Sequence, residues 1–211
     1  PVLSNDNKIL GVITAQDLVE AVDEEMGDDY AKLAGLTAEE DLNEPFKDSV
    51  KKRLPWLLLL LVLGLVVSSV VSIFEGVVQQ ITLVVAFQSL ILDMAGNVGT
   101  QSLAVTIRVI MDEALSKKDE RKLIFKEMRV GFTNGMILGV LAFVAIGVYI
   151  LVFKGKSVPF SFSVSGCIGI SLLFAMVVSS LVGTVVPLFF KKINIDPAVA
   201  SGPLITTVND L

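Results

Sequence analysis

Acidic residues in the apolar part of the chain are the first candidates for chemistry, because charge inside a bilayer is costly and usually functional. Four of them lie within or beside apolar runs: Glu75, Asp93, Asp196 and Asp210. We interpret Glu75 as interfacial, and Asp196 precedes Pro197, where it suits a helix N-cap. Asp210 lies 13 positions beyond Pro197. That is about 20 Å along a helix, which predicts a depth near the middle of a membrane.

Polar residues and glycines interrupt another apolar stretch, which covers residues 77–110. They are Gly96, Asn97, Gly99, Thr100 and Gln101. Irregular or closely approached backbone at this depth is tolerated only against protein or a water-filled cavity. The glycines could instead serve close helix packing alone, but packing does not require Asn and Gln as well.

The last apolar stretch carries Thr206, Thr207, Asn209 and Asp210, and is too polar to face lipid. Both polar stretches are satisfied if they line one aqueous pathway. A single acid with neutral oxygens favours cations, and it suits a mostly hydrated ion, because Mg²⁺ sheds water reluctantly. Two copies of Asp210 facing each other across a symmetric dimer would strengthen the field.

The composition indicates a membrane protein. The chain has 211 residues, 53% hydrophobic and 18% charged, against about 45–50% and ~25% in soluble domains. Residues 1–48 carry 13 acids and three bases, and the remaining 163 residues carry nine acids and 14 bases. This balance excludes a simple soluble enzyme and a basic nucleic-acid binder. With no histidine and one cysteine, Cys167, we expect no disulfide, Cys/His zinc site or histidine-dependent catalytic site.

The apolar runs predict an all-α, polytopic fold with five transmembrane helices, at 54–74, 77–110, 131–153, 164–190 and 197–211. The last is truncated, and we interpret the chain as a fragment. Twelve bases lie just before the first span and in the connections that follow the second and fourth spans, and two lie in the connection that follows the third span. This bias predicts a cytoplasmic N-terminus and an outside C-terminus. Residues 119–129 are either an interfacial amphipathic helix or a continuation of the third span.

Residues 1–30 form an acidic head. Its first part predicts a β-hairpin over residues 2–14, followed by a helix over Asp17–Met26 that Thr14 caps. The pattern over Gly11–Leu18 resembles the end of a CBS domain, so a nucleotide is a candidate ligand of the missing part of that module. Residues 31–53 connect the head to the first span, with a helix expected over Glu39–Arg53. The acidic cluster is either a solvated face or a site for divalent cations: Glu20, Glu24, Glu25, Asp28 and Asp29.

Three motifs, and the order of the parts, resemble the MgtE family of magnesium channels and transporters. The motifs are Asp93–Ser102 (DMAGNVGTQS), Val182–Leu188 (VGTVVPL) and Asp196–Asp210 (DPAVASGPLITTVND). The resemblance implies a homodimer with a pore between the subunits, lined by the second and fifth spans. It implies that Asp210 holds hydrated Mg²⁺, that Asn97, Gly99, Thr100 and the backbone of Thr206 line the pore, and that cytosolic Mg²⁺ at the acidic cluster closes it. Ser89 stands where the family often has proline, so no kink is implied there.

We therefore expect a passive, dimeric Mg²⁺ channel of the inner or plasma membrane, and not an enzyme. One alternative is a secondary transporter of divalent cations coupled to Na⁺ or H⁺, although the sequence has no clear inverted repeat. Another is a membrane receptor that reports a nucleotide bound to the CBS module. Such a receptor would need neither an acid at mid-membrane nor the Gly-Asn motif.

Overall fold

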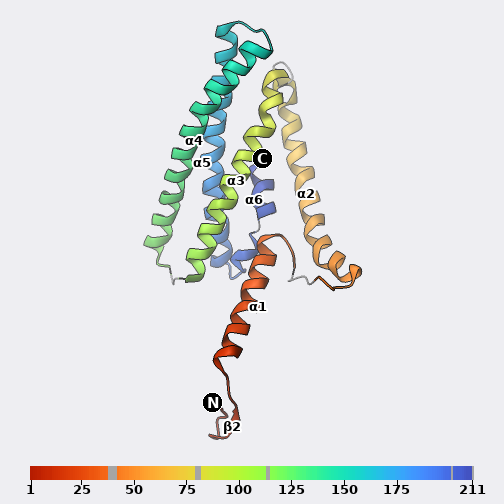
Figure 1. Ribbon diagram of the computed structural model, residues 1–211, viewed down its shortest axis with the longest axis vertical. Helices are drawn as coiled ribbons and strands as arrows, with labels where there is room; N and C mark the ends of the chain where they lie inside the picture. The colour runs from red at the N-terminus through yellow and green to blue at the C-terminus, as the bar shows by residue number, and fades with distance from the viewer. Residues whose placement is uncertain (38–41, 79–81, 113–114, 201, 211) are drawn as a thin grey trace.

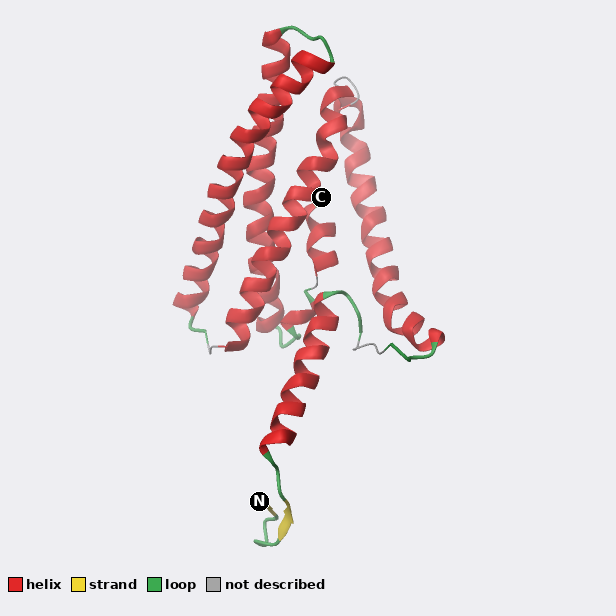
Figure 2. Cartoon of the chain, in the orientation of Figure 1, coloured by secondary structure: helices red, strands yellow, loops and turns green. Residues whose placement is uncertain are grey.

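A computed structural model describes residues 1–37, 42–78, 82–112, 115–200 and 202–210 of the chain, and most of these are helical (Figures 1 and 2). A small hairpin precedes a bundle of long helices. In chain order the elements are β1 (Val2–Leu3), β2 (Ile9–Gly11), α1 (Ala15–Leu33), α2 (Phe46–Val78), α3 (Thr82–Asp112), α4 (Lys117–Phe153), α5 (Val158–Lys192), the 3₁₀ turn η2 (Pro197–Val199) and α6 (Gly202–Asn209).

The N-terminal hairpin and the start of α1 confirm the predictions for the head. β1 pairs antiparallel with β2. The Thr14 hydroxyl accepts a hydrogen bond from the Asp17 N–H, and the Asp17 carboxylate accepts one from the Thr14 N–H at 2.7 Å. This capping box satisfies two exposed N–H groups, and the bond from the Thr14 N–H lowers the pKa of Asp17.

α1 runs on to Leu33, beyond the expected end near Met26. It ends in a Schellman motif, in which the N–H of Leu36 bonds to the carbonyl of Ala31 and the N–H of Gly35 to that of Lys32. Gly35 has φ +84°, the left-handed conformation that glycine adopts without steric cost. The helix therefore ends where glycine permits the turn.

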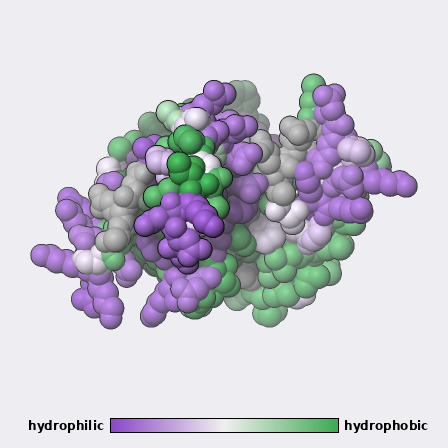
Figure 3. Space-filling model, turned by 90° about the horizontal axis from the view of Figure 1, so that it is seen from below, coloured by the Kyte–Doolittle hydropathy of each residue, from purple (hydrophilic) through white to green (hydrophobic). Residues whose placement is uncertain are grey.

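Four helices are long and apolar enough to cross a membrane: α2, α3, α4 and α5. They confirm the predicted all-α membrane fold. α6 is a short fifth helix inside the bundle, and it ends part of the way along the length of the bundle (Figure 1). α1 and the hairpin extend from one end of the bundle, and hydrophilic side chains project from this end, seen from below in Figure 3.

Several predicted boundaries are wrong. Residues 38–41 lie outside the described residues. The helix expected over Glu39–Arg53 begins at Phe46 and runs without a break into the first span. Residues 119–129 belong to α4, so of the two interpretations the continuous helix holds. Pro197 opens a 3₁₀ turn and α6 begins only at Gly202. Asp210 therefore lies about 12 Å along the helix axis from Gly202, where α6 begins.

α5 is the central helix of the bundle and packs on both α3 and α4. Val98 of α3 meets Leu172 and Met176 of α5 in one buried cluster, and residues of α4 and α5 form a second. A third cluster joins Leu103 and Ile107 of α3 to Ala200 and Ile205, at the base of α6. α6 is thus held on the α3–α5 pair by apolar contacts.

Candidate functional site

Glycines bring α3, α5 and α6 close together at the middle of α3. A Cβ at Gly99 would lie 2.5 Å from the hydroxyl of Ser179 and 2.8 Å from the amide nitrogen of Asn209. A Cβ at Gly183 would collide with the backbone of Gly99, and one at Gly96 would lie 3.0 Å from the methyl group of Thr206. The break expected at residues 96–101 does not occur, because α3 is regular helix there. The glycines instead allow close approach of the helices.

Ser179 fixes the orientation of Asn209. Its hydroxyl donates to the carbonyl of Ala95 in α3 and accepts from the Asn209 amide nitrogen at 2.6 Å. Because a hydroxyl has one proton, and Ala95 takes it, the Asn209 side chain must present its nitrogen to Ser179. The other end of the amide, Oδ1, is buried and has no hydrogen-bond partner among the described residues. A buried acceptor of this kind calls for a ligand or water.

Three further polar residues of α3 lie on an exposed face of the helix. Asp93, Asn97 and Gln101 follow one another at intervals of four residues, and all three are exposed in the single chain. Residues at this spacing share one helix face. A carboxylate and two amides on the face of a membrane helix are not tolerated against lipid, so this face must be covered by protein or water.

The polar residues of α6 complete the same region. The hydroxyls of Thr206 and Thr207 both donate to the carbonyl of Pro203, at 2.9 and 2.8 Å. The Asp210 N–H bonds to the carbonyl of Thr206 at 3.1 Å, and the Asp210 carboxylate is exposed. We call the residues Asp93, Asn97, Gln101, Thr206, Thr207, Asn209 and Asp210 the polar seam.

The structure brings only some of the predicted site residues together. Gly96 and Gly99 contact Thr206 and Asn209, and Thr100 lies beside Gly202 with its hydroxyl bonded to the Asn97 carbonyl at 2.9 Å. Among the residues that the structure describes, no hydrogen bond joins Asn97 to Asp210. Among the described residues no three acidic, cysteine or histidine side chains form a metal-binding group. The described part of one chain therefore offers no closed shell of acidic, cysteine or histidine ligands.

The base of α6 is tied to α1 by an ion pair. The Lys32 ammonium lies 2.7 Å from Asp196 Oδ2, and Asp196 also caps η2 by accepting from the Ala198 N–H at 2.9 Å. Asp29 lies 3.9 Å from the same ammonium. The role predicted for Asp196 as an N-cap is confirmed. Its ion pair with Lys32 of α1 was not predicted from the sequence.

These contacts shift three pKa values. The hydrogen bond to Asp196 raises the pKa of Lys32. Burial pulls the pKa of Asp196 upward, but the bonds from Lys32 and from the Ala198 N–H outweigh it and leave the pKa lowered. Burial, with the nearby Asp196 charge, raises the pKa of Asp29. The second carboxylate oxygen of Asp29 is buried without a hydrogen-bond partner among the described residues.

The end of α1 also touches the bases of α2 and α6 directly. Leu33 packs against the cluster that contains Ile205. A Cβ at Gly35 would lie 2.6 Å from the indole ring of Trp56 and 3.5 Å from Pro203. Trp56 of α2 is thus a contact of this turn.

The acids predicted to bind regulatory cations all lie on α1. Glu20, Glu24, Glu25 and Asp28 are exposed, and Asp29 is partly buried. The regulatory role of these five acids stays a prediction.

A second buried polar cluster, which the sequence did not reveal, holds α3, α4 and α5 together. The Ser102 hydroxyl lies 3.1 Å from Glu127 Oε2 and 2.9 Å from the Ser180 hydroxyl, and Ser180 donates to the Glu127 carbonyl at 2.7 Å. Glu127 is 5% exposed. In the sequence, Glu127 lies in a charge-rich segment, so this buried carboxylate cannot be told from its solvated neighbours. Ser179 belongs to no spacing pattern that would mark it as a site residue.

The fold and the polar seam define a polytopic helical membrane protein with polar residues along its transmembrane helices. The sequence profile of MgtE, a divalent cation transporter family, matches residues 88–211. The chain belongs to the MgtE family.

Relatives named magnesium transporter MgtE resemble the whole of this chain. The proteins of Enterococcus faecalis, Bacillus subtilis and Thermus thermophilus are 38%, 35% and 30% identical to it over 216, 211 and 215 residues. The alignments cover 100% of this chain but 44%, 45% and 45% of those relatives. The chain thus spans a little under half of their length.

Proposed function

We propose that this chain forms the membrane part of a Mg²⁺ channel, in which the polar seam lines the ion pathway and Asp210 holds the hydrated ion. The observation that carries this proposal is the exposed face of α3, with Asp93, Asn97 and Gln101, on a helix that packs against the polar α6. The names of the relatives support Mg²⁺ as the substrate.

The chemistry of the seam favours a cation that keeps its water. Asn209 Oδ1 is a buried acceptor without a partner among the described residues, and the Thr206 carbonyl lies one turn before Asp210. Neutral oxygens bind the water shell of Mg²⁺ by hydrogen bonds, while a carboxylate supplies charge. Anions would meet the carboxylate without a compensating base on the seam.

A second copy of the chain would complete the pathway. The polar face of α3 is uncovered in one chain, and almost none of the α2 span is buried within it. A two-fold dimer would bring two polar seams together and enclose water between them, which removes the polar face from lipid. The homodimer and the pore between its subunits are therefore part of the proposal.

The proposal also includes closure of the channel by cytosolic Mg²⁺. The contacts of Lys32, Leu33 and Gly35 at the base of α6 support a gate, because they join α1 to the pore helix. The ends of α3 and α5 and the start of α4, which lie at the α1 end of the bundle, carry most of the loop bases (Figure 1). This arrangement supports a cytoplasmic N-terminus in the cell membrane.

The test is Mg²⁺ uptake by cells that lack their own Mg²⁺ transport. Asp210→Ala and Asp210→Asn should abolish uptake, because both remove the charge at the ion site. Asp6→Asn, which removes an exposed acid from the hairpin turn, should leave it unchanged. Uptake at the wild-type rate in either Asp210 variant would exclude the assignment. Flux that persists after Na⁺ and H⁺ gradients are collapsed separates a channel from a coupled transporter.

A further inference from the structure

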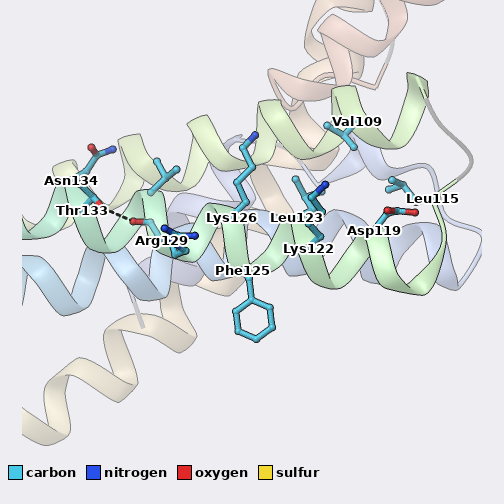
Figure 4. Close-up of a pocket in the computed structure, with 11 residues that line it drawn as sticks. Val109, Leu115, Asp119, Lys122, Leu123, Phe125, Lys126, Arg129, Thr133 and Asn134 are labelled. Carbon is cyan, nitrogen blue, oxygen red and sulfur yellow. Dashed lines mark hydrogen bonds between the residues drawn. The ribbon is translucent and has the colours of Figure 1, made fainter.

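An open groove lies at the start of α4, beside the end of α3 (Figure 4). Its volume is about 780 Å³. Val109 of α3 and Leu115 of the connection contribute apolar wall, and Leu123 and Val130 of α4 continue it. The groove is separate from the polar seam, and the function proposed above does not use it.

Three bases line one side of this groove. Lys122, Lys126 and Arg129 lie at positions i, i+4 and i+7 of α4, so they share one face over two turns. The Lys126 side chain is 64% exposed, and its ammonium nitrogen lies 3.8 Å from Glu127 Oε1. One acid, Asp119, lies at the outer end and is hydrogen-bonded to Ser116. Three bases and one acid leave an excess of two positive charges.

The length of α4 places these bases at the membrane surface. Its 37 residues extend about 55 Å, far more than the ~30 Å of hydrocarbon. The apolar part from Gly131 to Phe153 fills the hydrocarbon, so Lys122 to Arg129 lie in the layer of lipid headgroups. Thr133 and Asn134 line the groove one turn deeper. The groove thus lies where the headgroup layer meets the hydrocarbon, with its bases at headgroup depth.

We propose that this groove binds an anionic phospholipid, with its phosphate at Lys122, Lys126 and Arg129 and its acyl chains along Val130. Basic pockets between membrane helices bind anionic headgroups in this way. A lipid fits better than a soluble phosphate, because the wall is largely apolar and the groove opens where lipid phosphate is concentrated. A soluble anion would gain only screened attraction from exposed bases.

The experiment titrates phosphatidylglycerol into the purified chain in detergent and counts bound lipids by native mass spectrometry. Phosphatidylcholine is the neutral comparison. The variant Lys122→Gln/Lys126→Gln/Arg129→Gln should bind phosphatidylglycerol on the order of tenfold to a hundredfold more weakly. The matched control, Lys117→Gln/Lys118→Gln/Arg121→Gln, removes three exposed bases of the same helix that do not line the groove. It should change the affinity by less than about threefold, since these charges act only at a distance.

A third variant keeps the charge: Lys122→Arg/Lys126→Arg/Arg129→Lys should bind like the wild type, which separates loss of charge from loss of fold. Equal weakening by the groove variant and the matched control would overturn the proposal in favour of unspecific attraction. Displacement of the lipid by millimolar inorganic phosphate or glycerol phosphate would overturn it in favour of a soluble ligand. Equal affinity for phosphatidylcholine would also contradict it.

Discussion

The ammonium group of Lys32, in the last turn of α1, lies 2.7 Å from the carboxylate of Asp196, the residue that caps the turn before α6. A lysine of α1 thus bonds the residue at which the last helical segments of the chain begin. The pair is partly exposed, with side-chain exposures of 26% and 41%, so its own contribution is below about 1 kcal/mol. Its importance lies in where it attaches α1.

This contact predicts a pH window for docking of α1. The pKa of Lys32 is raised. Its charge therefore stabilises the docking of α1 below about pH 10.4, the pKa of lysine in the unfolded chain, and this stabilisation is lost as the pH rises through the pKa in the folded chain. The pKa of Asp196 is lowered, so its contribution is present above about pH 3.9 and is lost as the pH falls further. Asp29, whose pKa is raised, becomes neutral earlier on acidification and leaves the Lys32–Asp196 bond in place.

Trp56 reports this docking, because it is the single tryptophan and packs against Gly35. Its emission should be constant between about pH 4 and 10 and shift to the red outside that range. Lys32→Met should shift it at neutral pH. Lys51→Gln, which breaks the exposed Lys51–Asp48 pair of α2, is the control. An emission spectrum unchanged by Lys32→Met would show that the apolar contacts alone hold α1.

Gly99→Ala should destabilise the bundle by about 1–3 kcal/mol, as overpacking does, because the new methyl group meets Ser179, Asn209 and Ile205. Thermal unfolding in detergent measures the loss. Gly64→Ala is the matched control, since a Cβ at Gly64 of α2 has no neighbour within 4 Å. A stability loss of the same size at both positions would mean that close approach of α3 and α6 is not the cause.

Ser179→Ala removes the hydroxyl that joins Ala95 to Asn209. The buried amide of Asn209 then lacks a partner for its nitrogen, which costs about 1–3 kcal/mol. We expect lower stability, and lower Mg²⁺ flux because the Asn209 amide loses its fixed orientation. Ser171→Ala, at an exposed position of the same helix, should change neither quantity. Normal flux in Ser179→Ala would separate Asn209 from the pathway.

Glu127 predicts different effects for two substitutions. Glu127→Gln keeps an acceptor for Ser102 and should change the free energy of unfolding by less than about 1 kcal/mol. Glu127→Ala loses that acceptor and opens a cavity at the junction of α3, α4 and α5, which costs about 2–4 kcal/mol. Chemical unfolding in detergent compares the two. Similar losses for both would indicate that the carboxylate charge, rather than the hydrogen bonds, matters.

Neutralising the acids of α1 tests the proposed gate. Glu24→Gln/Glu25→Gln/Asp28→Asn should raise the internal Mg²⁺ concentration needed for closure on the order of tenfold, a typical coupling between sites. Patch recordings with defined internal Mg²⁺ measure this. The control, Asp6→Asn/Asp48→Asn/Glu120→Gln, removes three acids outside α1. Closure at the wild-type concentration in the α1 variant would contradict a sensor in this helix.

Apolar runs, cap residues and loop bases predicted the membrane fold, the capping box at Thr14 and the N-cap at Asp196. They did not predict that α3 is one continuous helix. A Gly-Asn segment looks irregular in the sequence, and only the structure shows that its glycines allow neighbouring helices to pack closely. Asp93, Asn97 and Gln101 share a face that local spacing reveals. Ser179 and Glu127 bond to residues 84 and 25 positions away, and only the tertiary packing shows such pairs.

The sparse packing of α2 has a consequence for biosynthesis. Of the four long helices, α2 has the highest mean hydropathy and the least burial within the chain, while α3 has the lowest mean hydropathy. α2 can therefore leave the translocon for lipid on its own apolarity, before any partner helix exists. α3 enters next with its amides and carboxylate uncovered, and α5, which it packs against, is made later. Retention of α3 at the translocon until α5 has been synthesised would be the expected order of assembly.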